Sequence, residues 1–208
     1  EINRSIIEEV KPEVLILATG GTHNIPDIPG INSKKVVTSK ALHNQLKSYL
    51  RFLGPELLNR LTHYWMPVGK NVVIMGVGIH GCQTAAFLVK RGRKVTIVET
   101  GETIGDGLLD MLVKPLLLGW LADKGTVMLS GVKYQEITDK GLTVITKEGQ
   151  KKTIEANTIL TALPMLPNPA LAKSLEGLAP EIYAIGDCKE PHLTVDAVAD
   201  GASIAFKI

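Results

Sequence analysis

The chain has 208 residues, which is enough for one large domain or two small ones. Its composition, 45% hydrophobic and 21% charged, is ordinary for a soluble globular protein. The net charge of +2 is nearly balanced and gives no reason to expect nucleic-acid binding.

Membrane insertion and secretion are also not expected. No apolar run approaches the roughly 20 residues that span a bilayer, and the first residues lack the layout of a signal peptide. With only two cysteines, Cys82 and Cys188, a disulfide framework is not expected either, so the sequence predicts a reducing cytoplasm. The chain starts at Glu1 instead of Met, which suggests a piece of something longer.

Four regular elements are expected in the N-terminal quarter. They are a helix over residues 1–10, a buried strand over residues 13–17, a short edge strand over residues 36–38 and a helix over residues 40–52. Ser39 is the expected N-cap of the second helix. The first strand runs into Ala18-Thr19-Gly20-Gly21, a turn of small residues at which backbone can approach a ligand closely.

Residues 51–68 carry Tyr64, Trp65 and Met66 just before the glycine-rich motif described next. Apolar residues at positions 57, 58 and 61 recur at helical spacing, which predicts a helix. Two interpretations stay open for this segment. It is either a helix packed on its own domain or a contact surface for a partner domain or a membrane interface.

The most informative stretch lies in the middle of the chain. An apolar strand over residues 72–75 leads into Gly76-Val77-Gly78-Ile79-His80-Gly81, a G-x-G-x-x-G motif. A helix over residues 82–90 and a second strand over residues 94–98 follow, and this strand ends at Glu99. The order of strand, glycine turn, helix, strand and acid is typical of the dinucleotide-binding βαβ unit.

Each glycine of this motif has a physical role. Gly76 permits the tight turn, Gly78 lets backbone approach a pyrophosphate, and Gly81 lets the helix pack close to the strand. The helix N-terminus offers N–H groups and the positive end of its dipole to the anion. Glu99 lies at the expected strand end, where a carboxylate can accept hydrogen bonds from a ribose diol. The alternative is a glycine-rich strand–helix turn in a domain that no longer binds anything.

The rest of the chain predicts further strands and helices. They are a helix over residues 108–122 that Pro115 kinks or breaks, a strand over residues 126–129, an antiparallel meander over residues 133–137, 142–146 and 152–155, a buried strand over residues 158–163, a strand over residues 181–185 and a small-residue helix over residues 195–206. Gly186-Asp187 follows the last of these strands.

Three motifs therefore stand in a fixed order. They are the strand before Ala18-Thr19-Gly20, the G-x-G-x-x-G unit that ends at Glu99, and the strand before Gly186-Asp187. This order resembles the pyridine-nucleotide oxidoreductases, flavoproteins in which an NAD(P) domain is inserted into an FAD domain. The resemblance implies an α/β fold with a Rossmann-like parallel sheet and an antiparallel β-meander.

The same resemblance implies a domain division. The FAD-binding domain would comprise residues 1–66 and 164–208, and the inserted NAD(P)-binding domain would comprise residues 67–163. The first G-x-G-x-x-G of the family, which holds the FAD pyrophosphate, is absent from this sequence. The FAD domain is therefore expected to be incomplete and to offer only half of an FAD site.

More narrowly, the stretches ATGGTHNIPDIPGI, GCQTAAFLVKRGRKVTIVE and YAIGDCKEPH are similar to the C-terminal part of NADH:flavin oxidoreductases of the old yellow enzyme class. Relatives include 2,4-dienoyl-CoA reductase, 2-enoate reductase and trimethylamine dehydrogenase. The absence of a C-x-x-C supports this comparison, and both cysteines are interpreted as small buried residues. In these relatives NADH reduces FAD, and electrons pass to a 4Fe–4S cluster and FMN in an N-terminal barrel. This chain lacks the barrel, so alone it is expected to be inactive.

The resemblance implies two sets of cofactor contacts and no catalytic acid or base, because hydride transfer to a flavin depends on placement. The residues implied for NAD(H) are Gly76, Val77, Gly78, Ile79, His80, Gly81, Glu99, Thr100, Ala162, Leu163 and Pro164. The residues implied for FAD are Ala18, Thr19, Gly20, Gly186, Asp187, Val195, Asp196 and Ala197. His80 either contacts phosphate or faces solvent, and the other histidines show no metal spacing.

Glu99 also predicts a preference for NAD(H) over NADP(H). A 2′-phosphate beside it would bring like charges together, and Thr100-Gly101-Glu102 holds no cation to receive that phosphate. The main alternative is a structural module that holds ADP without nicotinamide turnover, which bulky residues after Leu163 would favour. A stand-alone ferredoxin-reductase-like protein would need the missing FAD unit. Exposed sheet edges of such a piece could pair between copies, so a homo-oligomer stays open.

Overall fold

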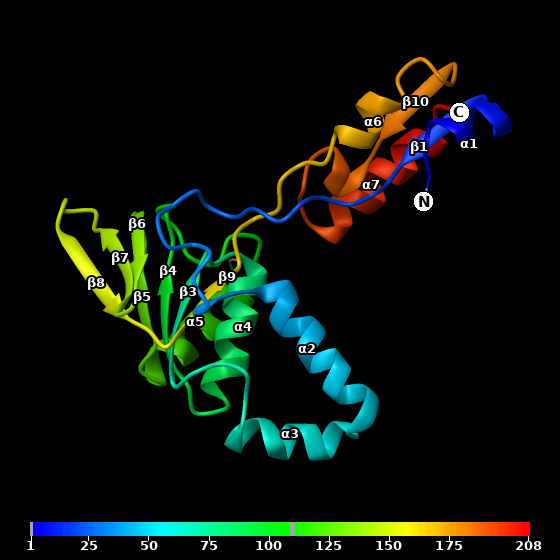
Figure 1. The fold of residues 1–208 in the computed structure, drawn as a ribbon. Coiled ribbons are helices and arrows are strands. Elements are labelled where there is room, and N and C mark those ends of the chain that lie inside the picture. The colour runs from blue at the N-terminus through cyan, green and yellow to red at the C-terminus, as the bar shows by residue number, and fades with distance from the viewer. Residues whose placement is uncertain (1, 109–110) are drawn as a thin grey trace. The chain divides into compact units, whose positions relative to one another are not determined.

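The computed structural model describes residues 2–108 and 111–208 and shows an α/β protein made of two compact units (Figure 1). The larger unit comprises residues 25–163, and the smaller unit combines residues 1–24 with residues 164–208. Parallel sheets and a separate antiparallel meander are both present, so the predicted fold class is confirmed.

The larger unit is built on a five-stranded parallel sheet. In spatial order its strands are β2 (Val36–Thr38), β9 (Thr158–Thr161), β3 (Asn71–Met75), β4 (Lys94–Val98) and β5 (Val127–Leu129). The short strand β2 lies at one edge, as predicted. The strand β4 begins and ends at the predicted residues, because its β-branched run is bounded by a turn and by Glu99.

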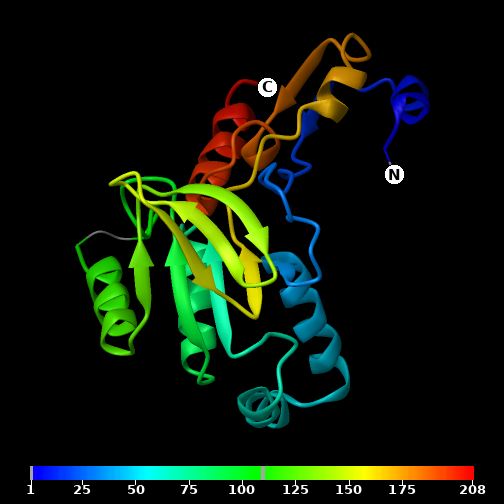
Figure 2. The same ribbon diagram turned by 60° about the vertical axis from the view of Figure 1, so that its left-hand side comes forward.

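Helices cover one face of this sheet and the meander covers the other (Figure 2). Two of the helices on the first face are α4 (Ile79–Val89) and α5 (Val113–Asp123). The meander consists of β6 (Lys133–Thr138), β7 (Gly141–Ile145) and β8 (Lys151–Glu155), paired in that order and antiparallel.

Alternate side chains of β3 serve these two faces, as the two-residue period of a strand requires. Val72 and Ile74 pack in a core with Cys82 and Leu88 of α4. Val73 and Met75 belong to the other core, which the meander supplies. Both faces of β3 are thus buried, which explains its continuous apolar sequence.

Residues 25–66 belong to the larger unit, which differs from the predicted domain boundary after residue 66. The pairing of β2 with β9 ties this segment to the parallel sheet. Leu42, in α2 (Ser39–Phe52), and Met66 lie in the same core as Val72. Local patterns do not predict this placement, because the pairing of β2 with β9 joins segments that are far apart in the chain.

The segment 51–68 contains the predicted helix, α3 (Pro55–Tyr64). Met66 is buried, while 90% of the Tyr64 surface is exposed. The Trp65 ring packs edge-on against the Tyr49 ring, with centroids 5.7 Å apart, and 59% of Trp65 stays exposed. Part of this stretch therefore packs on its own unit and part faces outward. Position 58 lies outside the described side chains.

Two of the boundaries that differ from the predictions have local reasons. Thr38 is the N-cap of α2, not Ser39, because its hydroxyl accepts a hydrogen bond from the N–H of Ala41 at 3.1 Å. The helix α5 begins at Val113, not at residue 108, which places Pro115 in the first turn. A proline is tolerated there because the first N–H groups of a helix have no partner within it. The predicted helix also included residues 109–110, which lie outside the described part.

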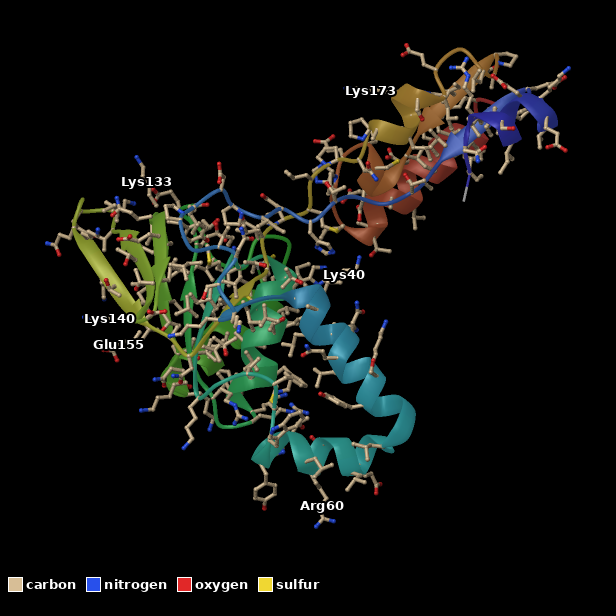
Figure 3. All side chains as sticks on the ribbon, viewed as in Figure 1. Lys40, Arg60, Lys133, Lys140, Glu155 and Lys173 are labelled. Carbon is tan, nitrogen blue, oxygen red and sulfur yellow. The ribbon has the colours of Figure 1, made fainter. Side chains whose placement is uncertain are left out.

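The smaller unit has a two-stranded parallel sheet of β1 (Val14–Leu17) and β10 (Glu181–Ala184). Its other elements are α1 (Arg4–Val10), α6 (Ala170–Ser174), the 3₁₀ turn η1 (Gly186–Cys188) and α7 (Thr194–Ala205). Ile7, Leu17 and Leu175 form its buried core. The charged residues labelled in Figure 3, such as Lys40 and Arg60 of the larger unit and Lys173 of the smaller one, are exposed.

Candidate functional site

The glycine turn after β3 is held by the close packing of its first and third glycines. Gly76 has a positive φ of 87°, and a Cβ added to it would lie 2.7 Å from the Cα of Leu163. A Cβ on Gly81 would lie 2.3 Å from the carbonyl oxygen of Gly76, which is closer than real Cβ atoms approach. The fold itself therefore requires glycine at both positions.

The middle glycine has no such requirement. Gly78 has φ −65° and ψ −166°, which other residues adopt readily, and it is the N-cap of α4. A Cβ on Gly78 would meet only the carbonyl oxygen of Asp106, at an ordinary 3.7 Å. No side chain caps this helix N-terminus. An anion at the helix N-terminus would account for the glycine, since phosphate oxygens approach backbone N–H groups there.

The carboxylate of Glu99 already has partners within the chain. Its Oε2 accepts a hydrogen bond from the N–H of Val77 at 2.7 Å. Its Oε1 accepts one from the N–H of Gly101 at 3.0 Å and one from the hydroxyl of Thr100 at 3.2 Å. Glu99 is half-buried and ties the strand end to the glycine turn. Two carboxylate oxygens have about four acceptor positions, so one remains for another donor.

Tyr134 of β6 is a neighbour of this carboxylate that the sequence did not reveal. Its hydroxyl donates a hydrogen bond to the carbonyl oxygen of Val98 at 3.0 Å. Burial raises the pKa of Tyr134 well above its ordinary value, and the charge of Glu99 raises it further. The hydroxyl therefore stays protonated and holds the end of β4. In the sequence, Tyr134 fits only the alternating pattern of a strand.

Cys82 lies beneath the glycine turn and is fully buried, as predicted. Its Sγ donates a weak hydrogen bond to the carbonyl oxygen of Val77 at 3.6 Å. Burial raises the pKa of this thiol to about 11; Lys114 lowers it and Glu99 raises it further. A neutral thiol in this position is structural. Cys188 is also buried, with its Sγ 3.0 Å from the carbonyl oxygen of Leu17.

Two of the three residues expected at the nicotinamide side, Ala162 and Leu163, lie beside the glycine turn. The N–H of Ala162 donates to the carbonyl oxygen of Met75 at 2.7 Å, and Leu163 packs against Gly76. Pro164 is exposed and falls in the other compact unit. His80 is exposed on α4, which is compatible with both of the roles considered for it.

The residues expected at a flavin lie in the smaller unit. Gly186, with a positive φ of 61°, packs against Ala197 of α7. Asp187 is half-buried, Val195 is 66% exposed, and Asp196 caps α7 by accepting a hydrogen bond from the N–H of Leu193 at 3.0 Å. The small-residue turn has Ala18 and Thr19 exposed, and a Cβ on Gly20 would meet nothing within 4 Å.

Asp200 of α7 is a further charged residue near Gly186 that the sequence did not single out. Its Oδ2 accepts a hydrogen bond from the N–H of Gly186 at 2.9 Å, and its Oδ1 lies 3.5 Å from the Nζ of Lys189. The Gly186 hydrogen bond holds the pKa of Asp200 below its ordinary value, and the charges of Lys189 and His192 add to this. Asp200 therefore fixes the turn that carries Asp187.

Within residues 2–108 and 111–208, no group of three or more His, Cys, Asp or Glu side chains is arranged to hold a metal ion. No helix in the same described residues is long and apolar enough to cross a membrane.

A parallel sheet with a glycine turn, a helix behind it and an acid at the next strand end defines a dinucleotide-binding α/β protein. The model of the pyridine nucleotide-disulphide oxidoreductase family matches residues 6–201, and the chain belongs to this family.

Three similar proteins illustrate this membership. The chain is 29% identical to an NADH oxidase of Thermoanaerobacter brockii, over 97% of this chain and 29% of that protein. It is 27% identical to a nitric oxide reductase FlRd-NAD(+) reductase of Aeromonas salmonicida, over 85% of this chain and 45% of that protein. A solved 2-naphthoyl-CoA reductase complex matches with a TM-score of 0.74 and 30% identity, over all of this chain and 29% of that one. The chain thus spans less than half the length of each.

Proposed function

We propose that this chain is the dinucleotide-binding part of an NADH:flavin oxidoreductase of the old yellow enzyme class. In this proposal residues 25–163 bind NAD(H), and the smaller unit contributes to an FAD site. The likeness to an NADH oxidase and to a 2-naphthoyl-CoA reductase over almost the whole chain supports the assignment. The proposal includes a barrel with FMN and a 4Fe–4S cluster elsewhere in the protein, and a cytoplasmic location.

The observation that carries the proposal is the contrast among the three glycines. Gly76 and Gly81 are explained by packing within the chain, whereas Gly78 is not. The space beside Gly78 lies at the N-terminus of an eleven-residue helix without a side-chain cap. This is the arrangement that a pyrophosphate needs, because its oxygens must approach backbone closely. The residues present therefore fit a dinucleotide.

The chain's own residues have distinct roles in this proposal. Backbone from Gly76 to Gly81 holds the pyrophosphate, with His80 at its exposed side. Glu99 and Thr100 hold the adenosine ribose, and Ala162 and Leu163 position the nicotinamide end. The bound nicotinamide and flavin supply the hydride chemistry, and the protein supplies placement and exclusion of water. Ala18 to Gly20, Gly186 and Asp187, and the start of α7 contribute to the flavin side.

The expected preference for NADH over NADPH follows from the carboxylate of Glu99. A hydrogen bond from a ribose hydroxyl to a carboxylate contributes about 1.5–3 kcal/mol, and about 1.4 kcal/mol corresponds to tenfold in affinity. A 2′-phosphate would lose that hydrogen bond and would also meet like charge. We therefore expect NADH to bind at least about tenfold more tightly than NADPH.

Calorimetric titration of the protein with NADH and with NADPH tests this expectation. Equal affinities, or tighter binding of NADPH, would contradict the role given to Glu99. Wild-type protein serves this test better than a Glu99 variant, because removing the carboxylate would also release the N–H groups of Val77 and Gly101.

A second titration separates the proposal from a structural ADP-binding module. If ADP binds as tightly as NADH, and the protein that carries its complete flavin domains does not oxidise NADH with an artificial electron acceptor, the structural module is correct. Oxidation of NADH under these conditions supports the oxidoreductase.

A further inference from the structure

The loop that follows β4 lies against the loop that follows β5. The N–H of Glu99 donates to the carbonyl oxygen of Leu129 at 2.8 Å, and the N–H of Gly131 donates to the carbonyl oxygen of Gly101 at 2.8 Å. These two hydrogen bonds fix the backbone on both sides of Thr100. Glu102 follows Gly101 in this loop, three positions after Glu99.

A lysine from a distant turn reaches this loop. Lys147 lies between β7 and β8, and its Nζ forms an ion pair with Oε2 of Glu102. The two side chains are separated by 45 positions in the sequence. Both lie over Gly131: a Cβ there would be 3.5 Å from Oε1 of Glu102 and 3.5 Å from Cδ of Lys147. The glycine leaves room for the pair.

The sequence holds no cation in Thr100-Gly101-Glu102, but the fold brings one to that loop. An ammonium group at the loop after this strand is the kind of group that would receive a 2′-phosphate, which carries about two negative charges. Lys147 is paired with Glu102 instead, which neutralises its charge. Both side chains are largely exposed, 62% for Lys147 and 69% for Glu102, so solvent and ligands can reach the pair.

We infer that Glu102 is a specificity-determining residue that occupies Lys147 and so prevents the protein from binding the 2′-phosphate of NADP(H). This inference rests on the proposed function, because it assumes that the adenosine ribose lies beside Glu99. It assigns the discrimination to two acids with different roles. Glu99 favours the ribose diol, and Glu102 neutralises the lysine that the phosphate would use.

The test is E102Q, which keeps the size of the side chain and removes its charge. Calorimetry at low ionic strength should show NADPH binding about fivefold or more tighter than in the wild type, with NADH changed less than about twofold. The double variant E102Q/K147Q should lose this gain, because the phosphate then has no ammonium partner. Added salt should also reduce the gain, as expected for exposed charges.

The chain offers a matched control. Lys151 of β8 forms an exposed ion pair with Glu136 of β6 at 3.0 Å, in the same meander but outside the loop after β4. E136Q removes the same charge from the same sheet and should leave both affinities unchanged. If E136Q raises NADPH affinity as much as E102Q, the effect comes from net charge and the inference is wrong.

Other outcomes separate this inference from the proposed function. If the wild type binds NADH but E102Q binds NADPH no better, only the role of Glu102 is refuted. If the gain persists in E102Q/K147Q, the lysine is not the phosphate partner, and the inference is again refuted. If the wild type binds neither dinucleotide, the proposed function and the inference fail together.

Discussion

Alanine substitutions at two glycines of the same turn should affect different properties. G81A should lower the stability of the fold, and G78A should weaken NADH binding. At Gly81, an added Cβ would lie 2.3 Å from the carbonyl oxygen of Gly76, well short of the 3.4 Å at which ordinary contact begins. The atom it meets is backbone, so α4 and the turn must move apart. Overpacking of this kind costs about 1–3 kcal/mol, and alanine regains up to about 1 kcal/mol within a helix. Because the clash is with backbone, the upper end of this cost applies, and about 3 less about 1 leaves a net loss of about 2 kcal/mol for G81A.

At Gly78 the balance is different. The added Cβ would find its nearest neighbour at 3.7 Å, and the backbone angles suit alanine. Alanine narrows the unfolded ensemble, which stabilises by about 0.4–1 kcal/mol, but it is a poorer N-cap than glycine by a similar amount. The stability of G78A should thus stay within about 0.5 kcal/mol of the wild type. Its affinity for NADH should fall at least about tenfold, because the methyl group occupies the approach of the pyrophosphate.

Urea denaturation and calorimetric titration of both variants measure these two effects separately. A G78A protein that binds NADH as tightly as the wild type would refute the reasoning about the middle glycine. A G78A protein destabilised as much as G81A would show that packing, not a ligand, accounts for the glycine.

Two further predictions concern buried and titrating groups. Cys82, whose pKa burial raises to about 11, should resist alkylation by iodoacetamide at pH 8 in the folded protein and react after unfolding in urea, as mass spectrometry can show; rapid labelling of the native thiol would contradict its burial. The pKa of Asp200 is held below its ordinary value by the N–H of Gly186, so its contribution to stability is present above the unfolded pKa and is lost as the pH falls through the folded one. The difference in melting temperature between wild type and D200N should therefore be steady above about pH 5 and shrink as the pH falls below the ordinary aspartate pKa of about 3.9, and a difference that does not shrink as the pH is lowered below that value would argue against this linkage.

Local sequence patterns correctly predicted the bounds of elements such as β2 and β4. The strand β4 and the edge strand β2 have the predicted bounds, because β-branched runs and flanking turn residues are signals within a few positions. The late start of α5 also has a local cause, since Pro115 is acceptable only near the first turn. The apolar residues before Pro115 made the predicted helix begin at residue 108, so the predicted helix was longer than α5.

What the sequence could not reveal depends on contacts between distant segments. The hydroxyl of Tyr134 reaches Val98, and Lys147 reaches Glu102, only because the meander folds over the parallel sheet. The hydrogen bond from Val77 to Glu99 likewise requires β3 and β4 to be adjacent, although both residues belonged to the predicted set. The motif thus identified the positions, and the pairing of strands determines which partners each acid has.

The pairing of β1 with β10 has a consequence for the order of folding. These strands lie side by side in register, Leu17 opposite Ala184, although the whole larger unit separates them in the sequence. Closing so long a loop in a disordered chain is entropically costly, and long-range strand pairing is slow for that reason. If residues 25–163 fold first, the loop is already structured and its closure costs less. Folding of residues 25–163 would then bring residues 24 and 164 close together, so that the two segments of the smaller unit could pair.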